Sequence, residues 1–180
     1  MDYRQLGRTD LNVSAICLGT MTWGEQNTEA EAFAQIERAK NAGINFIDTA
    51  EMYPVPPKAE TYATTERYIG NWFKQRGDRA DWVLASKIAG PGNTIDYIRD
   101  KQLKHNRKHI VEAVDASLKR LQTDWIDLYQ LHWPERSTNF FGQLGYKHQA
   151  DEDFTPLEET LEALDEQVKA GKIRHIGLSN

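Results

Sequence analysis

The sequence has few of the features that would place the protein in a membrane or in an oxidising compartment. Its single cysteine, Cys17, cannot form an internal disulfide, and the surrounding apolar run Val13–Leu18 predicts a buried, unreactive thiol. No apolar run is long enough to span a bilayer, and the N-terminal residues lack a signal-peptide pattern. We therefore expect no membrane partner and a cytoplasmic location.

An excess of positive charge and a glycine-rich phosphate loop are also absent. The net charge of -5 and the pI of about 5.6 argue against nucleic acid as a partner. Neither G-x-G-x-x-G nor a P-loop occurs, so any nucleotide must be bound without a Rossmann fingerprint. His105 and His109 are four residues apart, but the glutamate of a zinc-binding H-E-x-x-H motif is missing, and we expect no metal site.

The chain does contain enough apolar and aromatic residues for one folded domain. Hydrophobic residues make up 39% of its 180 residues, with five Trp and seven Tyr, which suffices for a core. A polar turn at Gly7–Asp10 predicts a small hairpin of Tyr3–Leu6 and Leu11–Val13. We treat residues 1–180 as a single domain, made of this hairpin (1–13) and alternating strand–helix units (14–180).

Four amphipathic segments with terminal signals predict helices. Thr28 and Glu31 form a capping box at the start of the first helix, and Gly43 supplies its stop. The second helix ends before Gly77, and the third begins near Asn106. We expect the basic stretch 104–109 at that point to be solvated.

The fourth helix has the most complete start signal. Thr155 is a predicted N-cap, Pro156 a first helical residue and Glu158 a capping-box partner. A solvated acidic segment at 151–153 precedes it. Its predicted buried face consists of Leu157, Leu161, Leu164 and Val168.

Short apolar runs alternate with these helices and predict five strands, at residues 15–18, 44–47, 82–87, 125–131 and 173–178. Strands that alternate with amphipathic helices are typical of βαβ units and of a parallel sheet. The sequence therefore predicts an α/β fold.

Polar side chains stand at several of the predicted strand ends. Asp48 ends a buried strand, and a carboxylate there is costly unless a cation such as Lys87, at the next strand end, pairs with it. His132 ends a third strand, and Tyr53 follows Asp48 by five residues. Taken singly, each has a structural explanation: a buried ion pair, a core histidine and a loop aromatic. Their coincidence favours one site.

Four sequence blocks carry a family resemblance: Asp48-Thr49-Ala50-x-x-Tyr53, Ser86-Lys87, Leu131-His132-Trp133-Pro134 and Gly177-Leu178-Ser179-Asn180. They resemble the signature blocks of the aldo-keto reductases, in particular the bacterial NADP(H)-dependent members. The resemblance implies a (β/α)8 TIM barrel of aldo-keto reductase type whose bottom the hairpin closes. About five of the eight βα units are present in the chain.

The resemblance further implies NADPH-dependent reduction of an aldehyde or ketone, with Tyr53 as the general acid. Hydride delivery builds negative charge on the carbonyl oxygen, which then needs a proton donor. An ammonium about 4 Å from a phenol contributes roughly 4 kcal/mol, or about three pKa units, so we expect Lys87 to lower the pKa of Tyr53. Asp48 would aim Lys87, and His132 would orient the carbonyl.

The resemblance also assigns the cofactor and substrate contacts. Ser179 and Asn180 are expected to hold the nicotinamide carboxamide of NADP(H), with Asp48 and the segment Gly19, Thr20 and Met21 beneath the cofactor. An amide and a hydroxyl suit a carboxamide, because each offers donor and acceptor groups. The expected substrate pocket consists of Trp23, Tyr53, His132 and Trp133, although core packing explains both tryptophans equally well.

Other functions remain open at this point. The partner expected for an enzyme is a small carbonyl compound, and a homo-oligomer is an open option. The chain is alternatively a non-catalytic NADP-binding regulatory subunit, a half-barrel that assembles with a second copy or a complementary fragment, or a truncated inactive fragment. In aldo-keto reductases the loops that grip the cofactor phosphates follow later strands, for which residues 1–180 hold no equivalent.

Overall fold

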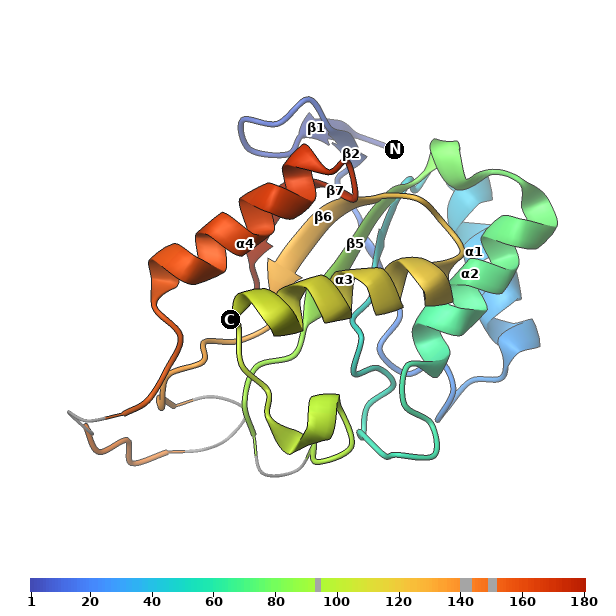
Figure 1. The fold of residues 1–180 in the computed structure, drawn as a ribbon. Helices are drawn as coiled ribbons and strands as arrows, with labels where there is room; N and C mark the ends of the chain where they lie inside the picture. The colour runs from blue at the N-terminus through green and yellow to red at the C-terminus, as the bar shows by residue number, and fades with distance from the viewer. Residues whose placement is uncertain (93–94, 140–143, 149–151) are drawn as a thin grey trace.

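A parallel sheet of five strands in the order β3-β4-β5-β6-β7 organises the computed structural model (Figure 1). The structure describes residues 1–92, 95–139, 144–148 and 152–180. The strands are β3 (Leu18–Gly19), β4 (Phe46–Asp48), β5 (Val83–Ile88), β6 (Ile126–Leu131) and β7 (Ile173–Leu178). Sequential parallel neighbours joined by helices match a partial barrel, with β3 and β7 as its two edges.

The helices follow the strands in the predicted alternation. They are α1 (Glu29–Asn41), α2 (Thr64–Arg76), α3 (Arg107–Leu121) and α4 (Leu157–Lys169), with short 3-10 turns at Arg79–Asp81 and Arg99–Lys101. The Thr28–Glu31 capping box is present, and Asn106 caps α3 by accepting from the His109 amide. Gly77 ends α2 with a φ of +68°, a left-handed conformation that glycine adopts without steric cost.

The N-terminal hairpin also forms as predicted. Strands β1 (Tyr3–Gln5) and β2 (Asn12–Ser14) pair antiparallel. The hairpin lies at the end of the sheet where the parallel strands begin, and the Ser14 amide donates to the side chain of Asn45 just before β4 (Figure 1). Asp10 in the hairpin turn lies 2.9 Å from His175 Nε2 on β7, which ties the hairpin to the edge strand.

The main core lies between the sheet and the helices. Ile36 on α1, Trp72 on α2, Ile110 on α3 and Leu164 on α4 are all buried against strand residues such as Leu84. A second apolar cluster lies at the opposite end from the hairpin, beyond the carboxyl ends of β4, β5 and β6, and consists of Ala50, Met52, Tyr53, Ala89, Ile95, Ile98, Leu103 and Trp133. This second cluster surrounds the groups that the sequence placed at the strand ends.

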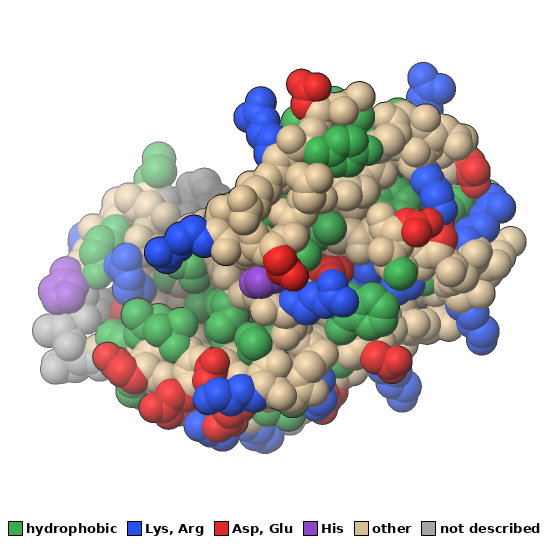
Figure 2. Space-filling view, turned by 90° about the horizontal axis from the view of Figure 1, so that it is seen from above, with side chains coloured by type: hydrophobic (Ala, Val, Ile, Leu, Met, Phe, Trp, Pro, Cys, Tyr) green, Lys and Arg blue, Asp and Glu red, His purple; other side chains and the backbone are tan. Residues whose placement is uncertain are grey.

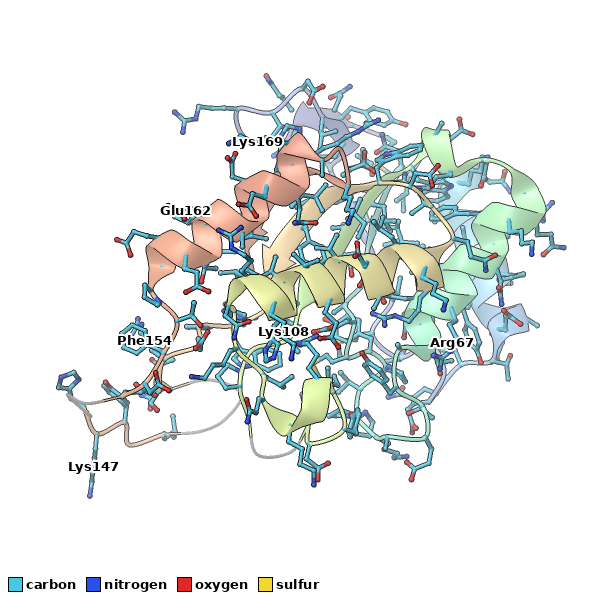
Figure 3. All side chains as sticks on the ribbon, in the orientation of Figure 1. Arg67, Lys108, Lys147, Phe154, Glu162 and Lys169 are labelled. Carbon is cyan, nitrogen blue, oxygen red and sulfur yellow. The ribbon has the colours of Figure 1, made fainter. Side chains whose placement is uncertain are left out.

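The surface carries no dominant charge on the face seen in Figure 2, where acidic and basic side chains are interspersed and hydrophobic groups are exposed between them. In Figure 3 Glu162 and Lys169 project outward from α4, and Lys147 lies on the long connection that leaves the body of the molecule before α4. Among the described residues, no helix is both long and apolar enough to cross a membrane.

Two predictions about the first strand are wrong. The predicted strand 15–18 is reduced to Leu18–Gly19, and Cys17 is exposed rather than buried. The reason is the position of β3 at an edge of the open sheet, where only β4 pairs with it. An apolar run predicts a buried strand only when neighbouring strands pair with it on both sides.

The start of α4 also differs from the prediction. Pro156 is the N-cap residue and no side chain caps this helix, because the Thr155 hydroxyl and amide both donate to Glu135. Leu164 is buried as predicted and Val168 is partly buried, but Leu157 and Leu161 are exposed. The other buried residues of α4 are Thr160, Ala163 and Gln167. The sheet and α3 therefore cover only part of the apolar face of α4.

Candidate active site

Asp48 and Lys87 form the expected ion pair at the carboxyl ends of β4 and β5. Lys87 Nζ donates to Asp48 Oδ2 at 2.6 Å and to the carbonyl oxygen of Thr49 at 2.8 Å. The Lys87 side chain is 5% exposed, whereas that of Asp48 is 29% exposed and faces the open side of the sheet. The local cause is the parallel register, in which Asp48 stands opposite Ala85, two residues before Lys87.

Tyr53 lies in the turn after β4 and packs onto this pair. Lys87 Nζ is 5.1 Å from the centroid of the Tyr53 ring, and the ring itself is buried. Burial, reinforced by the charge of Asp48, raises the pKa of Tyr53 to about 12. The expected lowering by Lys87 is therefore wrong for this resting state, because burial and the charge of Asp48 both raise the pKa of Tyr53.

His132 follows the last residue of β6 and completes the cluster. Its ring centroid lies 5.5 Å from that of Tyr53 in an edge-to-face arrangement and 4.9 Å from that of Trp133. Burial and the nearby Lys87 lower the pKa of His132 to about 3, so the imidazole is neutral at physiological pH. The His132 amide donates to the Ile88 carbonyl oxygen at the end of β5, which fixes the position of the His132 backbone relative to β5.

Three strand ends thus bring together all four side chains predicted for proton transfer. One further contact was not predicted: Gln130 Nε2 lies 3.4 Å from Asp48 Oδ1. Strand alternation places Gln130 on the same face as His132, so its orientation was visible in the sequence, although its partner was not. This arrangement holds a phenol, an ammonium–carboxylate pair and a neutral imidazole around the open side of the sheet.

The residues expected to hold a cofactor lie at the same end of the sheet. Gly19 stands opposite Asp48 in register, and a Cβ at Gly19 would meet nothing within 4 Å. Met21 is exposed, whereas Thr20 is buried and donates its hydroxyl hydrogen to the Asp48 carbonyl oxygen. An open floor at Gly19 beside Asp48 suits a flat ring that must approach the backbone closely.

Ser179 and Asn180 follow β7, the edge strand at the other side of the sheet from β3. The Ser179 amide donates to the Leu131 carbonyl oxygen, and Asn180 Nδ2 donates to that of His132 at 2.8 Å. Both residues are exposed. The Asn180 carboxamide oxygen and the Ser179 hydroxyl can therefore meet a polar ligand group next to His132, which fits an amide-bearing ring.

The two tryptophans proposed as pocket walls occupy different places. Trp23 is 1% exposed, belongs to the main core and donates from Nε1 to Gln35, so in this structure it does not line an opening. Trp133 packs beside His132 and also lines a cavity of about 380 Å³ with Phe154 near the start of α4. A Cβ at Gly90 would lie 2.6 Å from Trp133 Nε1, so glycine is required for this packing.

The stretch 104–109 is less solvated than predicted. His105 and His109 are 2% and 6% exposed, because the amide of His105 donates to Glu135 and the ring of His109 accepts from the Lys104 amide. Burial lowers the pKa of His105 to about 4. Asp153 is exposed and paired with Lys104; Asp151 lies outside the described residues.

Comparisons with known proteins give sequence relatives over the whole chain. Residues 15–180 match the family described as Aldo/keto reductase family. The chain is 52% identical over 181 residues to Protein tas of Escherichia coli (strain K12), covering 100% of the chain and 52% of that protein. It is 40% identical over 185 residues to the uncharacterized oxidoreductase YrpG of Bacillus subtilis (strain 168), covering 100% and 49%.

Two solved structures are also similar to this chain. A thermostable aldo-keto reductase, Tm1743, crystallised with the inhibitor epalrestat, superimposes with a TM-score of 0.71 at 32% identity, covering 100% of the chain and 54% of that structure. The holo form of aldo-keto reductase AKR11C1 from Bacillus halodurans also gives 0.71, at 33% identity, covering 99% and 50%. The chain thus spans about half the length of the relatives that it matches.

Proposed function

Because the chain belongs to the aldo/keto reductase family, we propose that it carries the proton-transfer half of an NADPH-dependent carbonyl reductase. The substrate would be an aldehyde or ketone and the product an alcohol. The observation that supports this proposal is that Asp48, Tyr53, Lys87 and His132, which come from three strand ends, lie in one cluster of contacting side chains.

Tyr53 is the proposed general acid. The reduced nicotinamide, when bound, supplies the hydride to the carbonyl carbon, and the oxygen must gain a proton as the C=O bond becomes a C–O bond. Burial keeps the Tyr53 hydroxyl protonated in the resting state, because it raises the pKa of Tyr53 to about 12. The Lys87 ammonium, 5.1 Å from the ring, stabilises the phenolate that forms when the proton leaves.

Asp48 and His132 have supporting roles in this proposal. Asp48 holds the Lys87 side chain beside Tyr53 through the 2.6 Å contact. His132 is neutral at pH 7, because burial lowers the pKa of His132 to about 3, so it can orient a carbonyl oxygen without adding charge. Water would return a proton to Tyr53 after each turnover.

The proposed cofactor is NADP(H). Gly19, Met21 and Asp48 would lie beneath its nicotinamide, and Ser179 and Asn180 would meet the carboxamide. Thr20 would contribute only indirectly, since its hydroxyl is occupied by the Asp48 carbonyl oxygen. The open space at Gly19 and the exposed side chains of Ser179 and Asn180 support this assignment.

Turnover in the full-length protein tests the proposal. NADPH oxidation, followed at 340 nm (about the nicotinamide absorbance maximum) with a reactive aromatic aldehyde, should depend on both reactants and yield the alcohol. Matched assays of Tyr53→Phe should show NADPH binding without turnover. NADPH binding without turnover in the unmodified protein would instead support the regulatory alternative.

A further inference from the structure

A second buried ion pair lies two residues from Tyr53 and takes no part in the proposed chemistry. Arg99 Nη1 donates to Glu51 Oε2 at 2.5 Å, and Arg99 Nη2 donates to Glu51 Oε1 at 2.7 Å. The Glu51 side chain is 1% exposed and the Arg99 side chain is 3% exposed. A bidentate pair of this kind fixes geometry as well as charge.

Glu51 extends the pairing of β4 and β5 beyond the end of β4. The Thr49 amide donates to Ala85 and the Glu51 amide to Lys87, which continues the parallel pattern. The amide of Ala89, the first residue after β5, donates at 2.6 Å to Glu51 Oε1 instead of to a backbone carbonyl. Because a side chain takes this position, the backbone turns away after Glu51, and the Tyr53 amide closes the turn onto Ala50.

Arg99 is held in place at some conformational cost. Its φ is +43°, in the left-handed region that residues other than glycine seldom adopt. Such a backbone persists where its surroundings determine it. Here Ile98 and Leu103 on either side of Arg99 are buried in the same cluster as Tyr53 and Trp133, and Arg99 Nη2 also reaches the Ala89 carbonyl oxygen at 3.3 Å.

We propose that Glu51 and Arg99 are positioning residues, which hold the Tyr53 ring against Lys87 and His132 by locking the turn after β4 to the end of β5. Both backbone groups of Ala89, two residues beyond Lys87, are engaged by this pair. The catalytic consequence rests on the proposed function, whereas the ordering of residues 49–54 does not.

Replacement of Arg99 in the full-length protein tests the proposal. In Arg99→Met the Glu51 carboxylate loses its cation in a closed site, and the turn loosens. We expect kcat to fall at least about tenfold, with KM for the aldehyde and Kd for NADPH within about twofold of wild type. Arg99→Lys, which keeps the charge but not the two parallel bonds, should recover part of kcat.

Arg79→Met is the matched control. Arg79 also forms a buried pair, with Asp127 at 2.8 Å, but it lies where β5 and β6 begin and donates to the Trp82 carbonyl oxygen. Its loss should destabilise the protein without changing kcat. Amide hydrogen exchange should accelerate locally at residues 49–53 and 88–90 in Arg99→Met, and not in Arg79→Met.

If amide exchange at residues 49–53 is the same in Arg99→Met and Arg79→Met, the proposal is overturned, whatever the turnover rates of the two variants. A kcat for Arg99→Met that equals that of active wild type overturns it as well. If the wild-type protein reduces no carbonyl compound, the proposed function fails, but the exchange comparison still decides whether Glu51 and Arg99 position the turn.

Discussion

Lys87 Nζ lies 2.6 Å from Asp48 Oδ2, and this contact sets the electrostatics of the whole cluster. Because the carboxylate offsets the ammonium, the Tyr53 ring gains little net positive potential before reaction. Burial then dominates and raises the pKa of Tyr53 to about 12. A charge that appears on Tyr53 or on a bound oxygen during reaction would meet the ammonium at close range, so the pair acts on the transition state more than on the resting phenol.

Tyr53→Phe tests the acid role most directly. The substitution removes one oxygen and leaves the ring that packs against His132 and Lys87. We predict that carbonyl reduction by the full-length protein falls by at least about 10²-fold, while NADPH affinity is nearly unchanged. Single-turnover rates and calorimetric titration measure the two quantities. Retained turnover would remove Tyr53 from the acid role.

Lys87→Met separates charge from packing. The Asp48 carboxylate would lose its cation, and the phenolate of Tyr53 would lose its stabilising charge, so we predict loss of turnover. Since the Asp48 side chain is 29% exposed, water can solvate it, and the free energy of unfolding should fall by no more than about 3 kcal/mol, the lower end for a broken buried pair.

Lys172→Met provides the control for this change. Lys172 and Asp115 also lie 2.6 Å apart, but the side chains are 35% and 50% exposed. Loss of such a surface pair should cost less than about 1 kcal/mol in urea unfolding and leave turnover intact. Equal stability losses in Lys87→Met and Lys172→Met would show that the Asp48–Lys87 pair is peripheral.

Much of this architecture follows from local sequence signals. The Thr28–Glu31 capping box, the Asn106 cap and the stop at Gly77 need only neighbouring residues, and all three are present. Strand β7 has the predicted bounds, Ile173–Leu178, because an apolar run between a helix stop and a polar end leaves little freedom. Asp48 and Lys87 meet because parallel strands end at one edge.

Features that depend on distant residues were not predictable. Thr155 does not cap α4, because Glu135, twenty residues earlier, takes its hydroxyl. The exposure of Cys17 reflects the edge position of β3, which no local pattern encodes. The pKa of Tyr53 was expected to fall, and it is raised because burial and Asp48 outweigh the single charge considered from the sequence.

Buried histidines should make the protein sensitive to mild acid. Burial lowers the pKa of His105 to about 4 in the folded protein, against about 6.5 in the unfolded chain. The unfolded state therefore binds more protons below pH 6.5, and stability falls as the pH drops from about 6.5 towards 4. His132 acts in the same direction, because the pKa of His132 is lowered to about 3.

Urea unfolding at two pH values measures this effect. Between pH 7.5 and 5.5, roughly, His105 should cost about 1 kcal/mol of stability, and His105→Gln should remove that part of the pH dependence. A wild-type stability that is constant over this range would contradict the prediction.

The last prediction concerns a chain limited to residues 1–180. Its sheet is open, so β3 and β7 present unpaired backbone groups. Leu178 on β7 is 75% exposed and lines the same cavity as Leu157 of α4; Leu157 and Leu161 are also exposed. An apolar surface next to a free strand edge favours association. We predict that this chain forms oligomers or aggregates, and that Leu178→Lys combined with Leu161→Lys shifts it towards monomer. Leu144→Lys, at a leucine that is even more exposed and lies on the long connection before α4, should not. Light scattering across a concentration series distinguishes these outcomes. A monodisperse wild-type monomer would show that the open edges at β3 and β7 do not cause association.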